Sequence, residues 1–200
     1  MTINLLNKHD DNSDLYSDHD TSVTPEQSVT LFPEISATSA TNALRPQFWS
    51  RFALTELNHS EWEALCDGCG SCCLIKYIDE DENGDVDEEL VEYTDVTCQL
   101  MDCATGYCQH YATRQEHVPD CIQLTINNLP NMMWLPAHCA YKRLYKGQNL
   151  PSWHLLLTGD AVKTQQQMRA ANVGVAGRCV SETSMSDEEM ETRVVNWVKP

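Results

Sequence analysis

The sequence contains no long apolar run. None of its 200 residues belongs to a stretch approaching the roughly 18 consecutive apolar residues that a membrane-spanning helix needs. The first residues, MTINLLNKHDDNSD, also lack the basic region and the following apolar region of a secretory signal. We therefore expect a cytoplasmic protein with no membrane partner.

Basic residues are scarce. The chain has 13 Lys and Arg residues against 30 Asp and Glu residues, which gives a formal net charge of −17. A surface of this kind repels phosphate backbones and anionic lipid headgroups. Nucleic acid is therefore not an expected partner.

Common catalytic patterns are also missing. The chain contains no G-x-S-x-G, Walker A, G-x-G-x-x-G or H-E-x-x-H pattern. The sequence therefore singles out no catalytic residue and no organic cofactor, and it leaves open whether the protein is an enzyme.

Cysteine is abundant by comparison. Four of the ten cysteines lie in CDGCGSCC, residues 66–73, where Cys66, Cys69 and Cys72 form consecutive C-x-x-C steps and Cys73 follows directly. Thiolates are soft ligands for zinc and for iron–sulfur clusters, and C-x-x-C spacing lets one turn present two sulfurs to one ion. A disulfide framework is disfavoured because a cytoplasm keeps thiols reduced. This segment therefore predicts a metal centre.

The spacing leaves the metal undecided between zinc and iron. A ferredoxin-type run would need a fourth cysteine four residues after the third, followed by proline, and a zinc ribbon would need a second, separate C-x-x-C pair. Adjacent residues of an extended segment point to opposite sides. We therefore expect Cys72 and Cys73 either to serve two ions or to leave one thiol facing away.

Two further candidates are weaker. His110, His117 and His138 lie near cysteines in the sequence, but isolated histidines are more typical of surface or packing positions. The acidic segment 79–90 matches the first ligand positions of an EF-hand loop, yet Leu90 stands where the loop needs a bidentate Glu. We expect a solvated acidic hairpin there instead of a calcium site.

The expected fold is α+β. Residues 1–44 are poor in large apolar side chains and predict a disordered acidic tail, and residues 45–200 predict a small, irregular, mainly helical cysteine-rich domain. Strand-like arms LIKYI and LVEYTDV flank Asn83-Gly84, which predicts one β-hairpin that returns Cys98 toward the motif.

Helix ends are marked by local signals. Ser60 followed by Glu63 predicts a capping box for a helix that starts at Glu61 and delivers Cys66, and Ser186 predicts a second N-cap. The segment AHCAYKRLYKG predicts a short helix that ends at Gly147.

Several blocks resemble a known family. The segments EWEALCDGCGSCCL, CQHYATRQEHVPDC and NLPNMMWLPAHCAYKRLYKGQNLPSWHLLLTGD are similar to the CxxCxxCC family of zinc- or iron-chelating domains, in particular to its YcgN-like branch of uncharacterised bacterial proteins. The resemblance covers roughly residues 47–182, and Cys108-x-x-Tyr111-x-x-Arg114 is similar to the family's C-x-x-Y-x-x-R element. It implies a ligand set of Cys66, Cys69, Cys72, Cys73, Cys98, Cys108, Cys121 and Cys139.

The chain departs from this family at two places. Relatives tend to carry a cysteine where this chain has Gly106, and whether Cys103 replaces it is left open. Cys179 falls at a position that is usually apolar, so it is left out of the ligand set.

The resemblance implies chelation but brings no established reaction. We expect a metal-binding protein that holds zinc or iron, either as ions or as a 4Fe–4S cluster, and whose fold is stapled by about 10–16 kcal/mol of binding energy. An iron–sulfur redox enzyme or electron-transfer protein is the alternative. A metal delivery or sensing protein is a further one.

Overall fold

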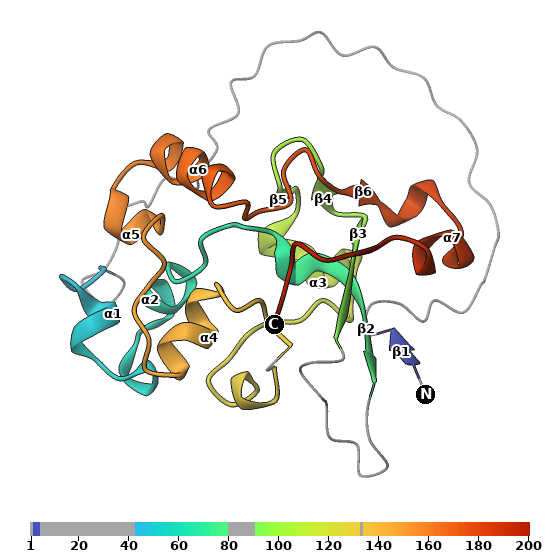
Figure 1. Cartoon of the computed structure of the whole chain (residues 1–200). Helices are drawn as coiled ribbons and strands as arrows, with labels where there is room; N and C mark the ends of the chain where they lie inside the picture. The colour runs from blue at the N-terminus through green and yellow to red at the C-terminus, as the bar shows by residue number, and fades with distance from the viewer. Residues whose placement is uncertain (1, 5–42, 80–90, 133) are drawn as a thin grey trace, which may run out of the picture.

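The computed structural model describes residues 2–4, 43–79, 91–132 and 134–200 (Figure 1). It is a small α+β structure with several short helices and a small sheet, as the sequence predicts. Most of the predicted tail and the predicted Asn83-Gly84 turn, with the acidic segment around it, lie outside the described residues. Within the described part of the chain, no helix is long and apolar enough to cross a bilayer.

The main sheet has five strands. Its order is β1-β2-β3-β6, and β7 also pairs with β3. The β2/β3 pair is the predicted hairpin, and its antiparallel pairing is confirmed. The parallel β3/β6 pair and the short edge strands β1 and β7 carried no signal in the sequence. The strands are β1 (Thr2–Asn4), β2 (Leu74–Asp79), β3 (Glu92–Thr97), β6 (Val180–Ser181) and β7 (Val194–Val195).

The two central strands are buried on both faces. Leu74 and Ile75 on β2 and Val96 on β3 are inaccessible to solvent, so consecutive residues of β2 are covered from opposite sides. The Cys98 backbone N–H donates to the Cys73 carbonyl at 3.2 Å, just beyond the paired residues. The hairpin therefore returns Cys98 to the motif, as predicted.

A second, two-stranded sheet was not predicted. Strands β4 (Met101–Asp102) and β5 (Tyr107–Cys108) pair in antiparallel fashion. Each has only two residues, which is too short to leave an alternating pattern in the sequence. This ribbon places Cys108 opposite Met101.

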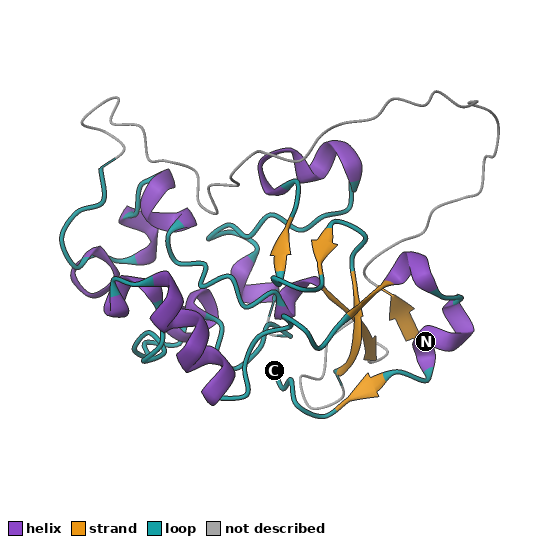
Figure 2. Ribbon diagram, turned by 90° about the horizontal axis from the view of Figure 1, so that it is seen from above, coloured by secondary structure: helices purple, strands orange, loops and turns teal. Residues whose placement is uncertain are grey.

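Most of the helices gather at the end of the molecule away from the main sheet (Figures 1 and 2). The helices there are α1 (Phe48–Arg51), α2 (His59–Glu63), α4 (Ala140–Tyr145), α5 (Leu155–Thr158) and α6 (Ala161–Ala170), whereas α3 (Arg114–His117) and α7 (Asp187–Glu191) lie nearer the strands. Short 3-10 turns connect them, namely η1 (Leu54–Glu56), η2 (Ser71–Cys73), η4 (Tyr111–Thr113), η5 (Leu129–Asn131) and η6 (Glu182–Ser184).

The helix-end predictions had mixed outcomes. Ser186 caps α7, and Gly147 follows the end of α4 with a positive φ of 70°; both are confirmed. The predicted capping box of Ser60 and Glu63 is wrong, because Asn58 is the N-cap of α2 and its side chain accepts from the Glu61 N–H at 3.0 Å. Since α2 ends at Glu63, Cys66 lies in the turn that follows the helix.

Candidate metal centre

Six of the eight predicted cysteines line one cavity of about 110 Å³. They come from the turn after α2, from η2, from the end of β3, from β5 and from the loop after α3. The remaining wall is mostly aliphatic and aromatic and includes Leu100, Val118 and Trp134. The six residues are Cys66, Cys72, Cys73, Cys98, Cys108 and Cys121.

Two glycines shape the motif turn. Gly68 and Gly70 both have a φ of 71°, a conformation that L-residues with a side chain rarely adopt. A Cβ atom at Gly68 would come within 2.8 Å of the Tyr107 ring. Both glycines are therefore required by the backbone conformation, and Gly68 is required in addition by the close approach of β5.

Cys72 and Cys73 face the same cavity, so the expected extended segment is wrong. They belong to the 3-10 turn η2, which rotates successive side chains by about 120° where a strand rotates them by about 180°. Their Sγ atoms lie 3.9 Å apart. Two adjacent thiols therefore open onto one cavity, where they can serve either one ion or two neighbouring ions.

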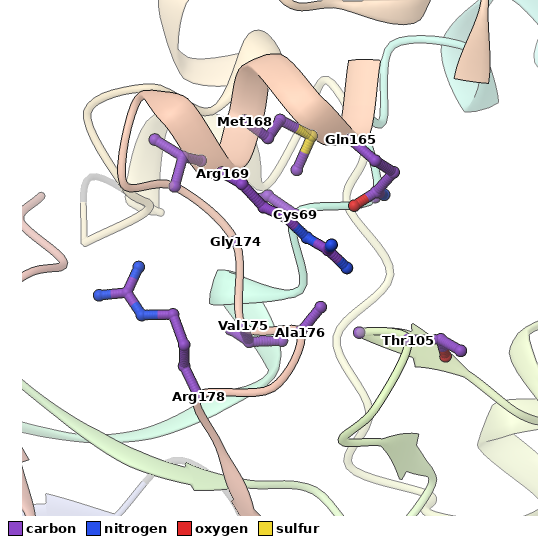
Figure 3. A pocket seen from close by; sticks show the side chains of 12 residues that line it. Cys69, Thr105, Gln165, Met168, Arg169, Gly174, Val175, Ala176 and Arg178 are labelled. Atoms are coloured by element: carbon purple, nitrogen blue, oxygen red, sulfur yellow. The ribbon is translucent and has the colours of Figure 1, made fainter. Parts of the chain in front are cut away.

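Cys69 and Cys139 do not line this cavity. Cys69 borders a second cavity of about 110 Å³ together with Arg169 and Arg178 (Figure 3). Cys139 is the residue before α4 and is partly exposed. Both nevertheless lie within electrostatic reach of the motif, since the charge of Cys72 contributes to raising the pKa of each of them.

The thiols are near one another without forming a finished coordination site. Within the described ranges, no three Cys, His, Asp or Glu side chains are placed so that they could hold one ion together. A metal ion would therefore have to draw several thiols inward. The donor set itself fits, because clustered soft sulfurs are the ligands that zinc and iron–sulfur clusters prefer.

Sequence comparison identifies the family of the segment that carries these thiols. Residues 65–140 match the CxxCxxCC family, described as "Putative zinc- or iron-chelating domain". A UPF0260 protein of Parvibaculum lavamentivorans is 43% identical over 157 residues, which cover 78% of this chain and 95% of the relative. A UPF0260 protein of Shewanella pealeana is 44% identical over 150 residues, which cover 75% and 94% respectively. The chain belongs to the UPF0260 family. No solved structure shows significant similarity to it.

In this UPF0260 protein the C-x-x-Y-x-x-R element reaches the cavity. Tyr111 and Arg114 both line it, and the Arg114 guanidinium lies 4.2 Å from the centre of the Tyr111 ring. The Arg114 charge also acts on the Cys121 thiol: burial raises the pKa of Cys121, and Arg114 opposes this rise. The element therefore joins β5 to the loop that carries Cys121.

A buried lysine is the site residue that sequence reasoning missed. Lys76 on β2 is 1% exposed, and its Nζ lies 3.1 Å from the Cys72 carbonyl and 4.4 Å from the centre of the Trp134 ring. No carboxylate pairs with it among the described residues. The signal was present, since Lys76 interrupts the apolar run LIKYI, but a lone lysine in a strand usually points to solvent.

Burial and neighbouring charges shift the pKa values of the site residues in opposite directions. Desolvation lowers the pKa of Lys76 to about 8, although the nearby thiols act in the raising direction. The hydrogen bond from the Cys73 thiol lowers the pKa of Cys72 to about 7, and the Lys76 ammonium adds to this effect. Burial raises the pKa of Cys98 to about 11 and that of Cys139 to about 12. Without a bound cation, most of these thiols therefore favour the neutral form.

None of the three candidate histidines lines the thiol cavity. The rings of His110 and His117 lie 4.4 Å apart on the exposed side of α3. His138 lies against Trp153, and its Nε2 atom is buried without a hydrogen-bond partner in the part of the chain that the structure describes. The packing interpretation of these residues stays the better one.

Proposed function

We propose that this protein chelates zinc or iron through eight cysteine thiolates. The observation that carries the proposal is the convergence of six of them on one cavity, from segments spread over residues 66–121. When bound, the metal would neutralise the thiolates and cross-link the segments that carry them. The proposed ligands are Cys66, Cys69, Cys72, Cys73, Cys98, Cys108, Cys121 and Cys139.

The effects of the thiols on one another's pKa values support a division into two groups of four, where a neighbour is a thiol that shifts the pKa of another. Cys66 has Cys72 and Cys139 as neighbours, and Cys69 has Cys72 and Cys66. In the other group Cys73 has Cys121 as a neighbour after the adjacent Cys72, and Cys98 has Cys121 and Cys108. Cys72 also acts on Cys121, so it lies at the border of the two groups. Four thiolates are the complement of one tetrahedral zinc ion or of one 4Fe–4S cluster. The groups are Cys66, Cys69, Cys72 and Cys139, and Cys73, Cys98, Cys108 and Cys121.

Lys76 gives separate support. A buried ammonium without a carboxylate partner is costly, and it becomes tolerable when anions are close. The groups that act on Lys76 are the thiols of Cys72 and Cys73. A thiolate-rich centre beside Lys76 would supply the missing negative charge.

An iron–sulfur electron-transfer role is the second candidate. It is favoured by the apolar wall around the six thiols and by a cavity of about 110 Å³, which is more room than one zinc ion needs. Burial in apolar surroundings is one of the factors that tune the reduction potential of a cluster. The cavity itself does not separate these two candidates.

Anaerobic purification followed by metal analysis and a visible spectrum tests both. A colourless protein with two zinc ions per chain fits the first candidate, and a brown protein with iron and sulfide in cluster proportion fits the second. A fully folded protein without either metal, after expression with both available, would contradict chelation.

Serine variants assign the ligands. Cys69→Ser and Cys121→Ser remove a sulfur from different groups, so each should lower the metal content by about one of two ions or clusters. Cys179→Ser is the matched control and should keep the full content, since Cys103 is the one thiol that acts on Cys179 and it belongs to neither group, whereas Cys66 and Cys72 act on Cys69. Full occupancy in the Cys69 variant would show that the proposed ligand set is wrong.

A further inference from the structure

Two cysteines remain outside the proposed ligand set, and they lie together. Cys103 is on the turn between β4 and β5, and Cys179 directly precedes β6. Neither lines the thiol cavity. Cys103 is partly exposed, whereas Cys179 is only 8% exposed and belongs to the hydrophobic core.

The backbones that carry them are fixed against each other. The Gly177 N–H donates to the Cys103 carbonyl at 2.7 Å. Three residues along the turn, a Cβ atom at Gly106 would meet Ala176 at 3.2 Å. The turn therefore packs closely on the segment that leads into β6 (Figure 1). This packing makes Cys103 a neighbour of Cys179, and Cys103 packs against the core cluster to which Cys179 belongs.

The two thiols differ in their surroundings. Burial, followed by the neighbouring Cys103 thiol, raises the pKa of Cys179 to about 12. Cys179 therefore keeps its proton. This arrangement leaves the more exposed thiol as the point of attack on an outside reagent and the buried thiol as its internal partner.

We propose that Cys103 and Cys179 form a redox-modification site, which a low-molecular-weight disulfide converts into an intramolecular disulfide. The Cys103 thiolate attacks one sulfur of the small disulfide, forms a mixed disulfide and releases one small thiol. Cys179 then loses its proton to the solvent and attacks the Cys103 sulfur, which releases the second small thiol. The protein loses two electrons and two protons in total, and the small disulfide gains them.

The proposal goes beyond metal chelation and does not depend on it. Oxidation would join the β4–β5 turn covalently to the chain before β6, and the turn lies between the proposed ligands Cys98 and Cys108. The backbone there is already held by the Gly177–Cys103 hydrogen bond. Disulfide formation should therefore leave the metal content unchanged.

Peptide mapping of the full chain as purified tests this inference. The protein is incubated with oxidised glutathione, free thiols are blocked with N-ethylmaleimide, and tryptic peptides are sequenced by mass spectrometry. Trypsin releases residues 179–193 with Cys179 as their one cysteine, and residues 77–114 with Cys103 between Cys98 and Cys108. We expect one linked peptide pair, with the bond at Cys103.

Two variants make the result specific. Cys179→Ser removes the internal partner, so Cys103 should accumulate as a stable mixed disulfide with glutathione. Cys103→Ser should leave Cys179 reduced, because the buried thiol is reached through its neighbour. Cross-links that join Cys179 to Cys98 or Cys108, or a Cys103 that stays reduced in both the parent chain and the folded Cys179 variant, would overturn the proposal.

Discussion

The thiol cavity and the corner built by α1 and α2 are held together by different means. At the corner, Arg45 Nη2 lies 2.6 Å from the Oε2 atom of the fully buried Glu61, and Glu61 also completes the Asn58 capping box. At the cavity, turns and two-residue strands bring thiols together, and the buried charge of Lys76 has no carboxylate partner among the described residues. The corner satisfies its own charges, whereas at the cavity the proposed metal and its thiolates would supply the charge that Lys76 lacks.

Removal of the metal should have the largest effect of all these changes, and it should destabilise the cavity more than the corner. A structural zinc ion contributes up to about 10–16 kcal/mol, so chelation should lower the melting temperature steeply. Hydrogen exchange should report loss of protection around β5 and the loop after α3, while α1 and α2 keep theirs longer. Re-addition of zinc or iron is the control and should restore protection. Equal loss in both regions would show that the corner has no independent stability.

Lys76→Met should weaken metal binding but stabilise the metal-free protein. Loss of the ammonium beside the thiolates should weaken metal binding roughly tenfold, or about 1.4 kcal/mol. The metal-free protein should become more stable, because a buried ammonium without an anion is replaced by an apolar side chain. Chelator competition measures the metal affinity, and thermal unfolding with and without metal measures the stability of each state.

Lys142→Met provides the matched control for that variant. Lys142 is also buried, but its Nζ donates to the Leu135 carbonyl at 3.1 Å, whereas that of Lys76 donates to the carbonyl of Cys72. Its replacement should leave metal affinity unchanged. A similar loss of affinity in both variants would mean that Lys76 acts only through general packing.

Glu61→Gln should weaken the corner and spare the cavity. Loss of the charged hydrogen bonds to Arg45 should lower the free energy of unfolding by about 1.5–3 kcal/mol with no change in metal content. The exposed Glu116→Gln is the control and should have little effect. Metal loss in the Glu61 variant would show that the two regions are coupled.

The same carboxylate predicts a dependence on pH. The hydrogen bond from Arg45 lowers the pKa of Glu61 to about 2 from its ordinary value of 4.5. Because the folded-state pKa is the lower one, this contribution is present above about pH 4.5 and is lost as the pH falls toward 2. Urea unfolding of the parent chain and of Glu61→Gln should therefore differ at pH 6 and converge near pH 2.

Deletion of residues 1–44 should have the smallest effect. It removes β1, whose three residues pair with the edge of β2, so the free energy of unfolding should fall by on the order of 1 kcal/mol. The deleted segment contains no cysteine, and the metal content should stay the same. A large loss of metal would place part of this segment at the site.

Features set by neighbours in the sequence were predictable, and features set by distant partners were not. The hairpin, the Ser186 cap and the Gly147 helix end depend on a few adjacent residues. Ser60 and Asn58 both precede a glutamate by three residues, and the distant Arg45 pairs with Glu61, the glutamate of the Asn58 box. Helix α6 escaped notice because only Thr164 and Met168 are buried along its ten residues.

The site was predicted at the level of residue types and only in part at the level of position. C-x-x-C spacing indicated thiolate ligands, and the hairpin placed Cys98. The separation of Cys69 from the shared cavity depends on the loop before β6, because the Val175 N–H donates to the Cys69 carbonyl at 3.0 Å. Lys76 was missed because its burial depends on Trp134, which is distant in the sequence.

Cys72 and Cys73 are consecutive residues, so the peptide bond between them couples the two proposed groups. An ion that fixes Cys72 also fixes the backbone of η2, and so orders Cys73 for the second group before any ion arrives there. The entropy of ordering the turn is then lost once for two binding events, which makes the second event more favourable than the first. Native mass spectrometry during a zinc titration should therefore show mainly empty and doubly loaded chains, and a dominant singly loaded species would show that the groups fill independently.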